Sequence, residues 1–185
     1  MRIIAGEFRG RRLAAVGKGD PGAHLRPTTD RVREALFNML DGGRFGQPFD
    51  GSRVLDLFAG TGALGLEALS RGSAFVTFVE KGRVGQGLIR ENLTLLGCAD
   101  RVKLLGTDAL RLPQAEAPAD LVFLDPPYGK GLGEKALAVA RGAGWIAPDA
   151  LIVWEENAPQ TAPDGFTLLE SRKYGDTVVT LLSNG

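Results

Sequence analysis

Short apolar runs alternate with longer amphipathic stretches along most of this chain. From residue 53 onward the runs are rich in β-branched and aromatic residues and recur about every twenty to thirty residues. Such runs are typical of strands buried on both faces, and the stretches between them are long enough for helical crossovers. The pattern predicts an α/β fold with a mostly parallel sheet. The expected parallel strands are residues 54–58, 75–80, 102–106, 121–125 and 151–156.

The pattern changes at the two ends of the chain. Residues 166–174 and 177–183 are separated by a turn around Gly175 that is too short for a crossover, so they predict an antiparallel hairpin. Near the N-terminus, residues 2–8 and 11–16 predict a second, smaller β-hairpin. The expected product is a doubly wound sheet that ends in a reversed strand.

One helix is expected ahead of the sheet. Residues 30–40 place apolar side chains at helical spacing on one face, which should pack on the body of the protein. The charged residues Arg31, Arg33 and Glu34 are then expected on the solvent side. Residues 42–52, rich in turn formers, would connect this helix to the first parallel strand.

Composition excludes several classes of protein. The 185 residues are 44% apolar and 24% charged, as in one ordinary globular domain. Cys98 is the only cysteine and His24 the only histidine, so disulfides, zinc sites and a Ser-His-Asp triad lack residues. No apolar run reaches the roughly eighteen residues of a membrane span, and residues 1–10 lack the apolar stretch of a signal peptide. We expect a cytoplasmic protein without membrane contact or bound metal.

Charge is distributed unevenly although the net charge is zero. Residues 1–33 hold eight Lys or Arg against three acids, a charge of +5, and the remainder carries −5. This asymmetry indicates either an arm that meets a polyanion or a solvated surface hairpin, and charge alone leaves both open. The candidate polyanion contacts in the hairpin are Arg2, Arg9, Arg11 and Arg12.

A glycine loop follows the first parallel strand. Residues 56–65, DLFAGTGALG, pass into a helix-forming stretch, and their glycines let the backbone turn sharply and let a nucleoside approach closely. The segment also satisfies the permissive G-x-G-x-x-G pattern of dinucleotide enzymes. The loop therefore predicts a nucleoside cofactor without identifying it.

Three acids at strand ends bear on that cofactor. Asp56 would point into the cleft at the carboxyl edge of the sheet, where its charge suits a sulfonium and ammonium and repels a pyrophosphate. Glu80 closes the second strand, where an acid accepts both ribose hydroxyls of either kind of cofactor. Asp108 would accept the adenine amino group, or it would only cap a short following helix.

The segment Asp125-Pro126-Pro127-Tyr128 ends the fourth strand and is the most informative in the chain. Asp125 lies three crossovers of about 23 residues after Asp56, so both acids should edge one cleft at the point where strand order reverses.

An exocyclic amino group on a nucleobase is a poor nucleophile because its lone pair is delocalised into the ring. The Asp125 carboxylate and the Pro126 carbonyl would each accept one N–H and turn that lone pair toward a methyl donor, while the prolines keep the turn rigid. Tyr128 offers a ring for stacking, worth about 1 to 3 kcal/mol. The alternative is a rigid turn capped by an aspartate. The catalytic candidates are Asp125, Pro126, Pro127 and Tyr128.

The glycine loop, Glu80 and DPPY together resemble a class I S-adenosylmethionine-dependent methyltransferase that acts on an amino group of a base. The order of MRIIAGEFRGRRL, RPTTDRVREALFNML, VLDLFAGTGALGLEALSRG and DPPYG is similar to that of the RsmD family, the bacterial 16S ribosomal RNA guanine-N2 methyltransferases. The likeness spans essentially the whole chain. It implies a Rossmann-like sheet of seven strands with a small N-terminal hairpin, S-adenosylmethionine as donor and S-adenosylhomocysteine as product.

The resemblance also implies partners and boundaries. The substrate would be one guanine of 16S rRNA, within the small ribosomal subunit or its assembly intermediate, and we expect a monomer. Residues 1–24 would be a basic β-hairpin extension and residues 25–185 the methyltransferase domain. Arg26, Pro27 and Thr28 match the family's RPT element near the active-site mouth, and Arg26 and Thr28 are candidate RNA contacts without an assigned individual role.

The cofactor residues implied by the family, carried over position by position, are Asp56, Ala59, Gly60, Thr61, Gly62, Glu80, Asp108 and Ala109. Two features depart from the family pattern. Thr61 stands where serine is usual and keeps the hydroxyl. Gly82, Gly85 and Gly87 fall where the second crossover helix should start, which puts its first turns in doubt.

Three other functions remain open. A nicotinamide-dependent oxidoreductase explains the glycine loop and Glu80 but gives Asp56 and DPPY no role. A DNA adenine-N6 methyltransferase shares DPPY, but about 23 residues between Tyr128 and the fifth strand leave little room for a target-recognition region. A non-catalytic RNA-binding module needs only residues 1–33.

Overall fold

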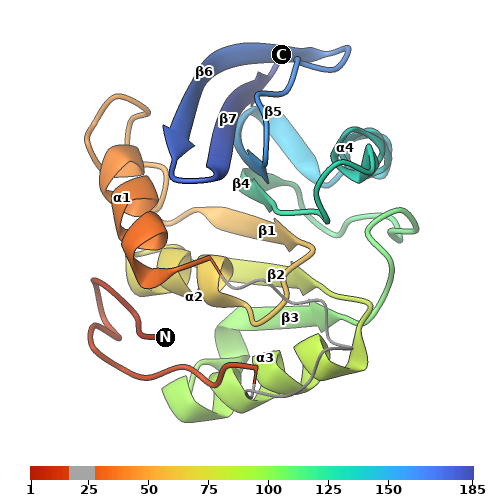
Figure 1. Cartoon of the computed structure of the whole chain (residues 1–185). Coiled ribbons are helices and arrows are strands. Elements are labelled where there is room, and N and C mark those ends of the chain that lie inside the picture. The colour runs from red at the N-terminus through yellow and green to blue at the C-terminus, as the bar shows by residue number, and fades with distance from the viewer. Residues whose placement is uncertain (17–27) are drawn as a thin grey trace.

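Seven strands form one sheet in the order β3-β2-β1-β4-β5-β7-β6 (Figure 1). The computed structural model describes residues 1–16 and 28–185. Strands β1 to β5 pair in parallel, and β7 is antiparallel to both β5 and β6. The strands are β1 (Arg53–Leu57), β2 (Phe75–Val79), β3 (Val102–Leu105), β4 (Ala119–Leu124), β5 (Ile146–Glu156), β6 (Phe166–Tyr174) and β7 (Thr177–Asn184).

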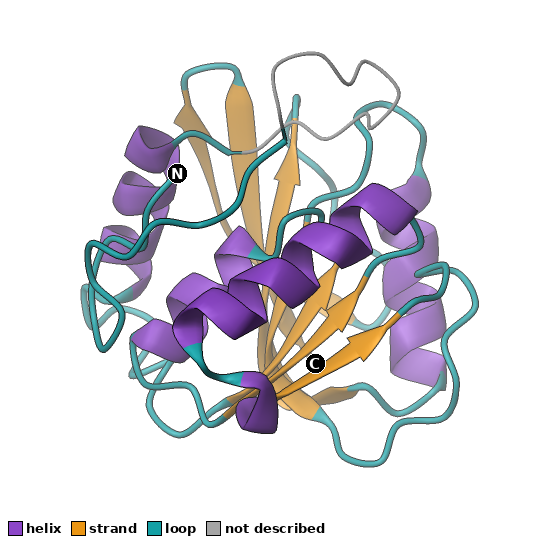
Figure 2. Ribbon diagram, turned by 90° about the horizontal axis from the view of Figure 1, so that it is seen from below, coloured by secondary structure: helices purple, strands orange, loops and turns teal. Residues whose placement is uncertain are grey.

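Helices cover both faces of this twisted sheet (Figure 2). Side chains of α1, α2 and α3 pack on one face, and side chains of α4 pack on the other. None of the helices in the described part of the chain is long and apolar enough to cross a membrane. The helices are α1 (Asp30–Leu40), α2 (Ala63–Ser70), α3 (Arg83–Leu96) and α4 (Leu132–Gly142), with the 3₁₀ turn η1 (Ala99–Arg101).

The predicted α/β fold and the C-terminal hairpin are confirmed. The five parallel strands lie within about two residues of their expected positions, except that β5 begins five residues earlier. Its first residue, Ile146, pairs with Ala119, and after a register shift Leu151 pairs with Leu121. The added residues extend a strand whose central part is apolar and buried between β4 and β7.

The predicted N-terminal hairpin is reduced to one antiparallel bridge between Arg2 and Arg12. The chain does fold back, and the Ile3 N–H donates to the Arg11 carbonyl at 3.0 Å. Residues 4–8, however, bind the end of α2 instead of pairing with a second strand. The two strands of the predicted hairpin do not form because backbone N–H groups of residues 4–8 already donate to α2.

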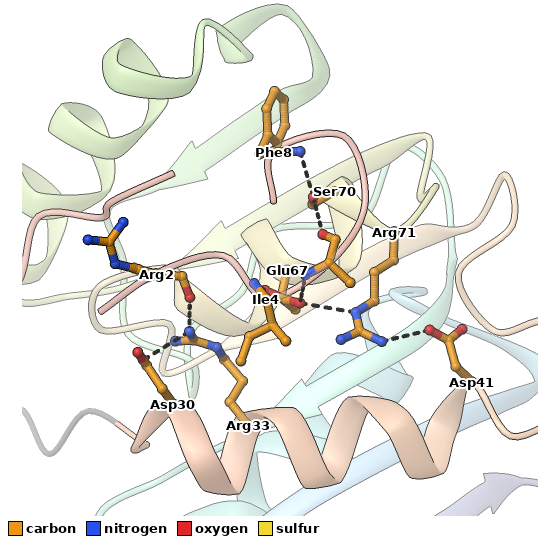
Figure 3. Close-up of polar contacts among 10 residues, drawn as sticks. Arg2, Ile4, Phe8, Asp30, Arg33, Asp41, Glu67, Ser70 and Arg71 are labelled. Atoms are coloured by element: carbon orange, nitrogen blue, oxygen red, sulfur yellow. Dashed lines mark hydrogen bonds and ion pairs between the residues drawn. The ribbon is translucent and has the colours of Figure 1, made fainter. Parts of the chain in front are cut away.

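Two buried side chains of α2 bind this segment (Figure 3), and the Glu7 N–H also donates to the Ser70 carbonyl at 2.8 Å. Glu67 accepts the N–H groups of Ile4 and Ala5 at 2.9 and 3.1 Å, and the Ser70 hydroxyl accepts the N–H of Phe8 at 2.9 Å. The same hydroxyl donates to the Ala5 carbonyl at 2.6 Å. These bonds give every polar atom concerned a partner, which offsets the cost of burial.

Arg33 contradicts the expectation that it lies on the solvent side of α1. Its side chain is fully buried, and its guanidinium donates to the Arg2 carbonyl and to the Asp30 carboxylate (Figure 3). Burial lowers the pKa of Arg33 below its usual value. The N-terminal segment (residues 1–16) covers this side of α1. Helical periodicity within residues 30–40 cannot predict that another segment covers one face of the helix.

We predict that Gly6 has a structural role that Gly10 lacks. A Cβ on Gly6 would lie 1.9 Å from the Ser70 carbonyl oxygen, whereas a Cβ on Gly10 would meet nothing within 4 Å; both residues have positive φ. Gly10→Ala should cost about 1 to 2 kcal/mol for its left-handed backbone. Gly6→Ala should cost more than about 4 kcal/mol because the segment must leave α2. Denaturant unfolding measures both, and equal losses would contradict the docking of this segment.

Candidate active site

The ends of the central strands bring two acids side by side. The last register pairs join Leu57 to Leu124 and Leu124 to Trp154. Asp125 follows Leu124 and Glu155 follows Trp154, so these two acids occupy neighbouring positions at the carboxyl edge of the sheet. The prediction that the fourth strand lies beside the first is confirmed. Asp125 and Glu155 both lie at the edge where open α/β sheets bind ligands.

Alternation along the strands decides which face these acids share. Side chains two residues apart point to the same face, so Asp56, Asp125 and Glu155 lie on the face that also carries Val54, Phe123 and Val153. Those apolar residues belong to the core packed by α1, α2 and α3. The acids are therefore enclosed by helices on one side and by the sheet on the other.

The glycine loop leaves β1 through left-handed backbone. Phe58, Gly60 and Gly62 have φ of 57°, 59° and 81°. A left-handed conformation at a residue as large as Phe58 costs about 1 to 2 kcal/mol, and the bonds Ala59 N–H to Val79 O at 3.0 Å and Gly62 N–H to Ala59 O at 2.8 Å hold it. Such strain is common at functional loops.

Asp56 lies beneath this loop. The side chain is 1% exposed, and its Oδ2 accepts the N–H of Gly65 at 3.0 Å in the first turn of α2. Burial raises the pKa of Asp56 well above its usual value, and nearby Glu80 and Glu155 raise it further. Asp56 thus fixes the loop from below, and a direct role toward a bound cation stays a prediction.

Glu80 joins the loop to the start of α3. Its Oε2 accepts the N–H of Gly60 at 2.7 Å, and its Oε1 accepts the N–H of Gly82 at 2.9 Å. Each carboxylate oxygen has a further lone pair, so Glu80 keeps the capacity to accept two hydroxyl groups. The backbone bonds hold it in one orientation before any ligand arrives.

The doubt about the first turns of α3 is resolved. The helix begins at Arg83, directly after Gly82. A Cβ on Gly85 would lie 2.8 Å from Glu80 Cγ and 2.9 Å from the Gly60 carbonyl oxygen. The glycine that weakens the helix by propensity is needed because α3 passes close to the loop and to Glu80.

Asp108 lies in the connection between β3 and β4, which contains no helix. Its Oδ1 accepts the N–H of Leu110 at 2.9 Å, and its Oδ2 is 4.0 Å from the ammonium of Lys81. This arrangement is the turn-stabilising contact that aspartate commonly makes two residues ahead. Ala109 beside it is buried. A contact between Asp108 and the adenine of a cofactor stays a prediction.

Hydrogen bonds to neighbouring strands hold the turn at Asp125–Tyr128. The Asp125 N–H continues the sheet by donating to the Leu57 carbonyl at 3.4 Å. The Tyr128 hydroxyl lies 3.4 Å from the hydroxyl of Thr177, at the start of β7. Just after the turn, the Gly129 N–H donates to Glu156 at 2.9 Å. Contacts to β1, β5 and β7 thus orient the turn.

Mutual repulsion and burial govern the charges at this edge. Burial raises the pKa of Asp125 well above its usual value, and the nearby Glu155 and Asp56 raise it further. Burial also raises the pKa of Glu155 to about 7. Two buried carboxyl groups, Asp56 and Glu155, and the partly buried Asp125 resist ionising together, so a cation among them would be stabilised.

Sequence reasoning missed two buried residues beside the site. Glu155 accepts the Thr28 hydroxyl at 3.0 Å, which gives the RPT element a contact at the strand ends. Asn92 of α3 donates to the Thr61 carbonyl at 3.0 Å and accepts the Ala14 N–H at 2.6 Å, so it links the loop to the N-terminal segment. The paired acids that end an apolar strand were a signal for Glu155; nothing in the sequence pointed to Asn92.

The candidate RNA contacts divide into two groups. Arg2 donates to the Gly10 carbonyl at 2.9 Å, and Arg11 donates to the Leu95 carbonyl at the end of α3, so both stabilise the fold. All four arginines are exposed, and of these four only Arg2 and Arg11 donate a side-chain hydrogen bond to another described residue. Arg26 lies outside the described residues.

Known proteins resemble this chain over its whole length. The family model described as "Conserved hypothetical protein 95" matches residues 1–183. Ribosomal RNA small subunit methyltransferase D of Escherichia coli strain K12 is 41% identical, over 98% of this chain and 88% of that protein. Its namesake from Haemophilus influenzae is 38% identical, over 100% and 94%. A solved structure of the putative methyltransferase yhhF from Escherichia coli has a TM-score of 0.83 at 37% identity and covers 100% of this chain and 97% of its own. The chain therefore belongs to the RsmD family, and its fold is that of an S-adenosylmethionine-dependent methyltransferase.

Proposed function

We propose that the protein transfers a methyl group from S-adenosylmethionine to the exocyclic N2 amino group of a guanine in 16S ribosomal RNA. The observation that carries the proposal is that the turn Asp125–Tyr128, called the catalytic turn below, and the glycine loop follow the ends of the paired strands β4 and β1. A hollow of about 690 Å³ lies between α4 and the chain leading into β6 and contains none of these residues. The support for the proposed site is therefore its position at the carboxyl edge of the sheet and not the volume of a cavity.

The residues at the site fit the donor by their chemistry. Glu80 keeps lone pairs for the two ribose hydroxyls, and Asp108 would accept the adenine amino group. Asp56 and Asp125 supply negative charge for a sulfonium and ammonium. When bound, the donor supplies an electrophilic methyl group on its sulfonium.

The catalytic turn would prepare the amino group for attack. The Asp125 carboxylate and the Pro126 carbonyl accept its two N–H bonds, which directs the nitrogen lone pair toward the methyl group. Tyr128 lies against the base, and its contact with Thr177 holds the ring in place. The proton released after transfer is taken up at the Asp125 carboxylate.

The proposed substrate is the RNA within the small ribosomal subunit or its assembly intermediate, and the proposed setting is the bacterial cytoplasm, with the protein acting as a monomer. The named relatives are rRNA methyltransferases of bacteria, which supports RNA over DNA. A methyl-transfer assay that offers DNA, naked 16S rRNA and small-subunit particles side by side tests this proposal. Methylation of DNA alone would favour the adenine-N6 alternative.

Removing the acid of the catalytic turn should stop the chemistry and spare donor binding. We predict that Asp125→Asn lowers kcat at least about 10²-fold, because the amide also donates and holds the amino group wrongly. The dissociation constant of S-adenosylmethionine should change less than about tenfold, or about 1.4 kcal/mol. Radiolabelled methyl transfer and calorimetry measure the two quantities. The exposed Asp164→Asn is the control, and full turnover by Asp125→Asn would exclude the mechanism.

A matched glycine pair in α3 tests the donor site. Gly85→Ala places a Cβ against Glu80 and the Gly60 carbonyl, so donor affinity should fall about tenfold or more, over about 1.4 kcal/mol. A Cβ on Gly87 meets nothing within 4 Å. Gly87→Ala should leave affinity unchanged and stabilise the helix by about 1 kcal/mol. Calorimetry with S-adenosylmethionine and with NAD separates the donors, and equal affinities of the two variants would argue against a donor held by Glu80.

The exposed arginines of the N-terminal segment should set the salt dependence of RNA binding. Replacing Arg9 and Arg12 with Ala should reduce the slope of log K against log salt by about 0.7 to 0.9 per lost phosphate contact. Arg44→Ala is the control, since Arg44 pairs with Glu170 on β6. Filter binding at several salt concentrations measures the slope, and an unaltered slope would leave these two arginines without an RNA contact.

A further inference from the structure

Two consecutive acids end strand β5 and serve opposite faces of the sheet. Glu156 binds the Gly129 N–H just after the catalytic turn, at 2.9 Å. Glu155 points to the other face, where its side chain is 1% exposed and its Oε2 accepts the Thr28 hydroxyl at 3.0 Å. Each acid thus holds one segment that borders the site.

The second oxygen of Glu155 is the unusual feature. Glu155 Oε1 is buried and has no hydrogen-bond partner among the described residues. A buried polar atom left in this way costs about 1 to 3 kcal/mol, which the fold tolerates beside the turn at Asp125. Within residues 1–16 and 28–185, the charged and titratable groups that act on Glu155 are Asp56 of β1, Asp125 after β4 and Tyr128 of the turn.

Thr28 lies between two fixed points. The next residue, Thr29, is the N-cap of α1, and its side chain accepts the Val32 N–H at 3.2 Å. The Thr28 hydroxyl reaches across to Glu155 on β5. The two threonines of the RPTT segment therefore do different work: one begins a helix, and the other ties the chain before that helix to the end of the central sheet.

We propose that Glu155 is a positioning residue for methyl transfer, which binds Thr28 with one carboxyl oxygen and lies next to Asp125 at the neighbouring strand end, so that the chain entering α1 is held beside the catalytic turn. This inference rests on the proposed function of the site. Glu155 acts through Thr28 and Asp125 and is not itself assigned a contact with the donor or the base.

The charge of Glu155 gives this role a signature that packing alone lacks. A carboxylate beside Asp125 opposes its ionisation and so raises the pH at which Asp125 becomes a carboxylate that accepts hydrogen bonds from the amino group. A neutral side chain of the same shape removes that opposition. Asp125 then ionises at lower pH, while the amide oxygen still accepts the Thr28 hydroxyl.

The first experiment therefore compares the pH dependence of kcat/KM for wild type and Glu155→Gln. We expect the acidic limb to move to lower pH by about one unit, the shift that one close like charge produces. Glu134→Gln, an exposed acid on α4, should leave the profile in place. Superimposable profiles of wild type and Glu155→Gln, with wild type active, would overturn the inference and leave the proposed function standing. A wild-type protein that methylates no nucleic acid would instead overturn the proposed function.

The second experiment tests the link through Thr28. Thr28→Val removes the donor to Glu155 and should raise KM for the small-subunit substrate about tenfold, as expected for a lost buried hydrogen bond to a charged group. Thr28→Ser should recover most of that loss because it restores the hydroxyl. Thr94→Val, at an exposed position on α3, is the matched control. The S-adenosylmethionine dissociation constant, measured by calorimetry, should not follow these changes. An equal KM in wild type and Thr28→Val would overturn the positioning role.

Discussion

Three carboxyl groups at the ends of β1, β4 and β5, two of them buried and one partly buried, are the constraint on which the site depends. Asp56, Asp125 and Glu155 share one face of the sheet, and burial raises the pKa of each. Protein cores normally exclude such groups, because the desolvation penalty of a buried charge exceeds its electrostatic stabilisation when it has no partner. Hydrogen bonds hold each acid in position. The Gly65 N–H donates to Asp56, the Asp125 backbone continues the sheet, and the Thr28 hydroxyl donates to Glu155.

The N-terminal segment is part of the same construction. Its backbone is bound by Glu67 of α2, and Asn92 of α3 ties it to the glycine loop. Arg71 pairs with the buried Glu67 at 3.0 Å and with the exposed Asp41 at 2.7 Å, so the ends of α1 and α2 and this segment share one polar network (Figure 3). Polar networks of this kind are satisfied only in one arrangement. The basic segment is thereby held in a defined position relative to the loop.

The sequence predicted what short-range patterns determine. Apolar runs gave the strands, and the spacing between Asp56 and Asp125 gave their adjacency, because crossover length limits where a parallel strand can return. Short-range sequence patterns could not predict contacts between segments that are distant in the chain. Arg33 was expected in solvent because the segment that covers it lies about thirty residues away, and the hairpin was expected because its competitor for hydrogen bonds, Glu67, lies about sixty residues away. Glu155 gained meaning only once β5 was placed beside β4.

The charge of the site also distinguishes the possible cofactors. A dinucleotide brings a pyrophosphate to the start of α2, directly above Asp56, whose carboxyl group already binds the Gly65 N–H in that turn. An anion there would compete with this carboxyl for the N-terminal amides of the helix. A sulfonium carries the opposite charge, and its attraction to the acids grows as water is excluded.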